Sequence, residues 1–90
     1  MDIAVVGRVE EFNHKILKNN RVLIWFFLVI ASYERVMIKQ IYKKEEAEEY
    51  FKILRNGNYV QVTGTKAFDH FINRECITCI KVIESISTTA

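Results

Sequence analysis

The stretch that decides the fold is VLIWFFLVI, residues 22–30. These nine consecutive apolar residues are rich in β-branched and aromatic types. A helix needs about 20 such residues to cross a bilayer, and the short length together with the β-branching favours a strand. Because alternate side chains leave a strand on opposite faces, this strand is apolar on both. One face can line a core, and the other must meet a different part of the chain, a second subunit or a ligand.

The size and composition of the chain indicate one small globular domain, residues 1–90. Half of the residues are hydrophobic and 27% are charged, which is unlike a disordered chain. Residues 1–5 lack the basic and then apolar pattern of a signal peptide. Cys76 and Cys79 alone do not form a disulfide framework. We therefore expect a cytoplasmic protein with reduced thiols and no membrane partner.

The charge of the chain is small but unevenly distributed. The net charge is +2, and four of the eleven acidic residues lie within residues 45–49. Outside residues 45–54 there are 12 basic and 7 acidic residues, a net charge of +5. A basic body with an acidic helix suits a polyanionic partner. The alternative is an ordinary solvated surface.

Periodicity predicts five strands and one helix. Alternating apolar residues and turn residues place the strands at 3–12, 22–30, 35–42, 59–66 and 74–86, with turns at 32–34 and 68–73. Residues 13–20 read as a hairpin arm that ends in an Asn19-Asn20 turn. Gly7 inside the first strand marks a bend or a close backbone approach, and a long strand that curves between two sheets would need such a glycine. Residues 43–54 carry a helical period, with Gly57 as a left-handed cap. The apolar side of that helix holds Ala47, Tyr50, Phe51 and Leu54.

The element order β-β-β-α-β-β predicts an all-β fold with one helix. Five strands with a helix between the third and the fourth match the five-stranded Greek-key barrel of the OB-fold. The barrel would span about residues 3–86, with 87–90 as a frayed tail. The helix would cover one end of the barrel with its apolar side.

Several segments together carry a family resemblance. They read VGRV at 6–9, EAEEYFKIL at 46–54, NGNYVQVTG at 56–64, RECI at 74–77 and IESI at 83–86. This series resembles the OB domain near the N-terminus of the Gram-positive-type replicative DNA polymerase III alpha subunit, and more broadly the anticodon-binding and single-strand-binding OB superfamily. It implies binding of single-stranded DNA (or RNA), without sequence specificity, and a partner in replication. The chain departs from the family in two ways: it has no exonuclease or polymerase sequence, and residues 22–30 are more apolar.

The resemblance also implies which side chains face outward. The family pattern puts Trp25, Phe27, Val29, Val36 and Ile38 in the core, and Phe26, Leu28, Met37 and Lys39 on the outer face. Phe26 would then stack on bases. Phosphates would be contacted by Arg21, Arg35 and Lys39, and the basic track would be extended by Lys15, Lys18, Lys66, His70 and Arg74. A slip of one residue would present Trp25 and Phe27 instead. Periodicity alone does not decide between the two arrangements, and the resemblance favours the first.

A second function fits the same apolar strand. Large exposed apolar patches mark protein interfaces, so the alternative is an OB-fold module for protein interaction or homo-oligomer formation. Cys76 and Cys79 are three residues apart in a predicted strand, where their thiols would diverge, so we expect no metal site. The sequence has no glycine-rich phosphate loop and no nucleophile–base pair. We therefore expect a binding module that is not an enzyme and has no cofactor.

Overall fold

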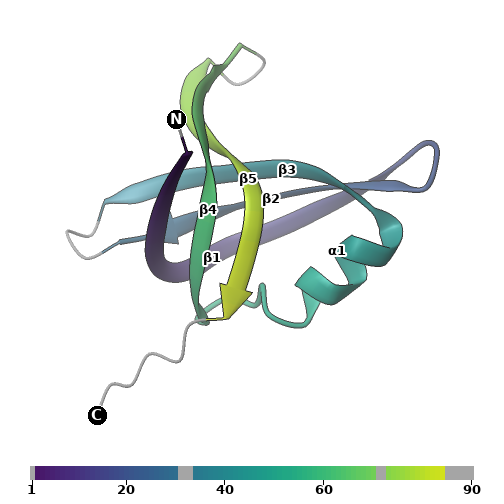
Figure 1. Ribbon diagram of the computed structural model, residues 1–90, viewed down its shortest axis with the longest axis horizontal. Helices are drawn as coiled ribbons and strands as arrows, with labels where there is room; N and C mark the ends of the chain where they lie inside the picture. Colours follow the sequence, from purple (N-terminus) through teal and green to yellow (C-terminus); the bar gives the residue numbers. More distant parts are fainter. Residues whose placement is uncertain (1, 31–33, 71–72, 85–90) are drawn as a thin grey trace.

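Five strands and one short helix make up the fold (Figure 1). The computed structural model describes residues 2–30, 34–70 and 73–84. Within them the order is that predicted from the sequence. The elements are β1 (Asp2–Leu17), β2 (Arg21–Val29), β3 (Arg35–Lys43), α1 (Lys44–Phe51), β4 (Tyr59–Asp69) and β5 (Arg74–Glu84).

The strands close into a barrel in the order β1-β2-β3-β5-β4. All neighbouring pairs are antiparallel except β3 and β5, which run parallel where Ile38 lies opposite Ile77 and Lys39 opposite Thr78. This short pairing closes the ring of strands. The architecture is the predicted OB-like barrel.

The first strand belongs to both sides of the barrel. Up to Arg8 it pairs with β4, and from Arg8 onward it pairs with β2. Gly7 lies at this change of partner, and a Cβ atom there would come within 2.4 Å of the carbonyl oxygen of Val29. The predicted close backbone approach at Gly7 is therefore confirmed, because only glycine permits two backbones to come so near.

The predicted hairpin turn is confirmed, and the second hairpin is longer than expected. Asn19 and Asn20 have φ values of 62° and 59°, in the left-handed region that asparagine tolerates. The arm that precedes them is part of β1, and β4 runs on to Asp69. The predicted turn at 68–73 therefore starts later. Residues 31–33, 71–72 and 85–90, with the predicted tail and parts of both turns, lie outside the described residues.

The helix is shorter than predicted but packs as expected. Ala47 is buried, as is Leu54 just after the helix, and both belong to the hydrophobic core cluster of the barrel. Figure 1 shows α1 beside the strands. Gly57 has a φ of +95°, but it lies in the following loop and does not cap the helix, which ends at Phe51. The Asn20 amide donates to Glu45 Oε1 at 3.1 Å, which ties the β1–β2 hairpin to α1.

The faces of β2 are the reverse of those that the resemblance implied. Phe26 and Leu28 are 1% and 0% exposed, so the prediction that they lie on the outer face is wrong. The half-buried outer positions belong to Trp25, Phe27 and Val29, which were expected in the core. Ile38 in the core is confirmed.

The pairing of β2 with β3 explains this reversal. Residues opposite one another in a sheet share a face, and Phe26 lies opposite Ile38 while Trp25 lies opposite Lys39. A lysine buried inside the barrel without a partner would be very costly. Lys39 therefore faces outward, its partner Trp25 faces outward with it, and Phe26 faces the core.

Candidate binding surface

The outer sides of β2 and β3 form a mixed aromatic and basic surface, here called the β2–β3 surface. Its centre consists of two cross-strand pairs, Trp25 with Lys39 and Phe27 with Met37. All four of these side chains are half-buried. Bulky apolar groups therefore alternate with cationic ones across the same face, which also holds Leu23, Val29, Arg35 and Ile41.

Two arginines lie over the Phe27 ring. The guanidinium carbon of Arg35 is 4.3 Å from the ring centroid, and that of Arg74 is 5.3 Å away. Arg35 comes from β3 and Arg74 from the start of β5, so separate parts of the chain meet at this ring. Both distances are within the range of cation–π attraction. The Phe27 ring thus attracts two guanidinium groups to the centre of the β2–β3 surface.

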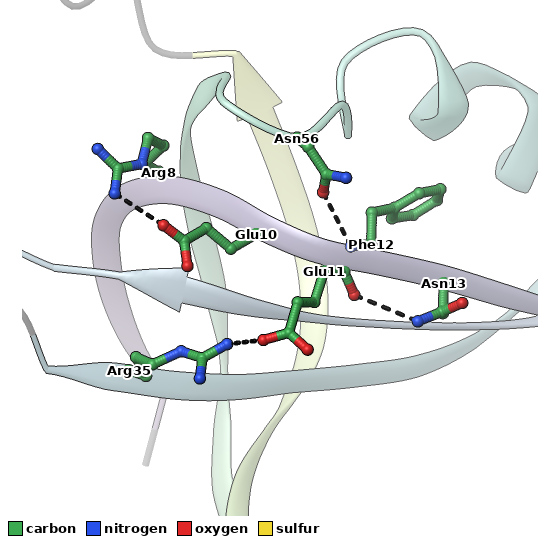
Figure 2. Close-up of polar contacts among 7 residues, drawn as sticks. All are labelled: Arg8, Glu10, Glu11, Phe12, Asn13, Arg35 and Asn56. Carbon is green, nitrogen blue, oxygen red and sulfur yellow. Dashed lines mark hydrogen bonds and ion pairs between the residues drawn. The ribbon is translucent and has the colours of Figure 1, made fainter.

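Arg35 is also paired with an acid on β1. Its guanidinium donates to Glu11, which lies where the β1–β2 register shifts and has a φ of 51° (Figure 2). The Arg35 and Glu11 side chains are 44% and 61% exposed. An ion pair that is this open to water stabilises a protein by about 0–1 kcal/mol at most. A stronger anion can therefore compete with Glu11 for Arg35.

A groove separates β3 from the β4–β5 hairpin, which projects beyond β3 in Figure 1. The groove has a volume of about 370 Å³. At one side Lys39 Nζ lies 2.6 Å from Asp69 Oδ2, and the two side chains are only 27% and 13% exposed. We call this space the hairpin groove; its other lining residues include Leu23, Ile41, Phe68, His70 and Thr78.

The remaining predicted cations lie toward the two hairpins. Lys15, Lys18 and Arg21 are exposed around the β1–β2 hairpin and have no ion pair in the described part of the chain. Lys15 lies opposite Leu23, on the side of the β2–β3 surface. Lys66 pairs with Glu75 at 3.1 Å on the exposed β4–β5 hairpin.

The structure therefore brings together only part of the predicted site. Around Phe27 it gathers Arg35, Met37 and Arg74, with Lys39 close by along β3. His70 lines the hairpin groove. Phe26 and Leu28 are excluded from the surface by burial in the core.

Sequence reasoning missed several residues of this surface. The sequence places Trp25 and Phe27 on the outer face only under the alternative arrangement of the strand. The sequence predicts a turn for Phe68 and Asp69, and no local pattern predicts that Asp69 meets Lys39 across 30 positions of sequence. One residue could have shown which face of β2 is outside. Lys39 must face water, so once β2 and β3 are paired in register, the β2 residue opposite Lys39 must also face outward.

Cys76 is buried behind the hairpin groove. Burial raises the pKa of its thiol, and the nearby Asp69 carboxylate acts in the same direction. The side chain of Cys79 lies outside what the structure describes. Among the described residues, no three histidine, cysteine or acidic side chains gather as a metal site would need. None of the helices in that same part of the chain has the length and apolar character to span a bilayer.

Comparison with known proteins supports the fold alone. No protein-family model matches the sequence, and no curated protein matches it. Among solved structures, the chain is similar to RecG in the structure of RecG bound to a three-way DNA junction, with a TM-score of 0.69 and 19% identity. The match covers 96% of this chain but 11% of the RecG chain. The narrower resemblance to the polymerase III alpha subunit stays a prediction.

Proposed function

We propose that the protein binds single-stranded DNA, with single-stranded RNA as the alternative ligand, across the β2–β3 surface. The observation that carries the proposal is the Phe27 ring beneath two guanidinium groups, beside the Trp25–Lys39 pair. OB-folds bind oligonucleotides on this face, between the loops that border it. The similarity to a protein solved with DNA gives further support.

Stacking supplies the part of the binding that tolerates any sequence. Bases stack on aromatic rings and on arginine guanidinium planes alike. Phe27 with Arg35 above it offers both kinds of plane. Trp25, two residues before Phe27 in the sequence, is its neighbour on the same face of β2. A strand laid along β2 would therefore place successive bases over these groups.

Phosphate contacts supply the rest. Arg35, Lys39 and Arg74 lie around the aromatic centre, and the exposed cations of the β1–β2 hairpin extend the positive charge to one side. Glu11 holds Arg35 only through an exposed pair, so a phosphate can replace it. We propose a binding module that is not an enzyme, located in the cytoplasm and acting with replication proteins.

The second candidate is assembly through the apolar residues of the same face. The row Leu23, Trp25, Phe27 and Val29 favours it. The arginines over Phe27 argue against it, because they would have to be buried in the interface. Sedimentation separates the two candidates, since a strictly monomeric protein at high concentration would remove the assembly role.

The salt dependence of binding tests the proposed phosphate contacts. Anisotropy of a labelled single-stranded oligonucleotide should show affinity that falls linearly with salt on logarithmic axes, by about 0.7 per phosphate contact. Arg74→Ala should make this slope shallower by roughly 0.7. Lys52→Ala is the matched control, because Lys52 follows α1 and is 70% exposed. Equal slopes for the wild type and Arg74→Ala would contradict the assignment.

A further inference from the structure

The hairpin groove lies beside the stacking residues but is not needed for sequence-tolerant binding. Its volume of about 370 Å³ is within the range of pockets that hold small organic ligands. It opens between the outer side of β3 and residues 67–70 of the hairpin. A base of a strand that crosses the β2–β3 surface could enter it from the Lys39 side.

The groove has an unusual pair of polar groups at its wall. The Lys39 ammonium group and the Asp69 carboxylate are 2.6 Å apart and mostly shielded from water. A carboxylate has about four acceptor positions and an ammonium group has three donors, so both groups can take part in several hydrogen bonds at once. A ligand that presents an acceptor next to two donors would match this pair.

Most of the other side chains that line the groove are apolar. Phe68 is 51% exposed, and its ring lies 5.0 Å from the His70 ring, centroid to centroid. Ile41 is 44% exposed and lines the groove from β3. Exposed aromatic and aliphatic groups around a charged pair suit a flat heteroaromatic ring with a polar edge.

We propose that the hairpin groove is a subsite for one base of the bound strand and that it selects guanine; this rests on the proposed function. The edge of guanine carries O6 beside the N1–H and N2–H donors. Asp69 would accept both N–H groups in a bidentate contact, and Lys39 would donate to O6. Cytosine, adenine and thymine each offer an acceptor where guanine has one of its two donors, and that acceptor would face the carboxylate.

The test uses short oligonucleotides of thymidine that differ at one central position. Wild-type protein should bind the strand with a central guanine about tenfold more tightly than the all-thymine strand, within the roughly 5- to 150-fold range of a good bidentate contact. Hypoxanthine at that position lacks the 2-amino group and should lose most of this gain. These two comparisons need no variant protein.

Asp69→Asn should abolish the preference, measured as the ratio of guanine-strand to all-thymine affinity within that variant. Glu75→Gln is the control, because Glu75 is an exposed acid on the same hairpin and should keep the ratio. Equal wild-type affinity for all central bases, or a guanine preference that survives Asp69→Asn, would overturn the subsite and leave the proposed function standing. Failure to bind any strand would overturn both.

Discussion

Phe26→Ala is expected to lower the free energy of unfolding by about 3–5 kcal/mol, the usual loss when a buried phenylalanine is truncated. Phe26 is 1% exposed and lies opposite Ile38 inside the barrel. Its removal leaves a cavity that the closed sheet cannot collapse to fill. Urea denaturation followed by circular dichroism measures the change.

The neighbour of Phe26 is its matched control. Phe27→Ala removes the same side chain from the outer face, where the ring is half-buried, and should cost clearly less stability. A larger loss for Phe27→Ala than for Phe26→Ala would contradict the strand faces described above, and with them the location of the binding surface.

Phe27→Ala is expected to have its main effect on binding. Loss of one stacking ring weakens binding to single strands by about 1–3 kcal/mol, which is roughly 5- to 150-fold in the dissociation constant. Truncation also removes the ring under Arg35 and Arg74, so their positions would be less well fixed. Anisotropy of a labelled oligonucleotide at low salt measures the effect.

Tyr59→Ala controls for the loss of any exposed aromatic ring. Tyr59 is 41% exposed and lies on β4 opposite Arg8 of β1, away from the β2–β3 pairing. It should bind oligonucleotides as the wild type does. Affinity of Phe27→Ala within twofold of wild type, with the fold intact, would show that the ring is not a stacking group.

The fold was predictable because its signals are local. Apolar residues that repeat every two or every 3.6 positions distinguished the strands from the helix. Two asparagines indicated the turn of the first hairpin, and Gly7 indicated the place where β1 changes its partner strand. Helix length was less predictable, since Tyr50 and Leu54 share an apolar side whether or not the backbone between them stays helical.

The site was less predictable because it depends on how the strands pair with one another. A strand that is apolar on both faces has no internal signal for which face is inside, and the resemblance favoured the wrong one. The Lys39–Asp69 pair and the arginines over Phe27 join residues far apart in sequence. Their meeting follows from barrel closure and hairpin length, neither of which a single sequence specifies at this detail.

The most direct test of the central claim is the fluorescence of Trp25 during an oligonucleotide titration. Trp25 is the chain's one tryptophan, and it lies on the β2–β3 surface opposite Lys39. Bases that stack along this surface should change its emission saturably, with the same midpoint as the anisotropy of the labelled strand. A rise in anisotropy with unchanged Trp25 emission would place binding elsewhere, and no change in either signal at low salt would contradict nucleic-acid binding itself.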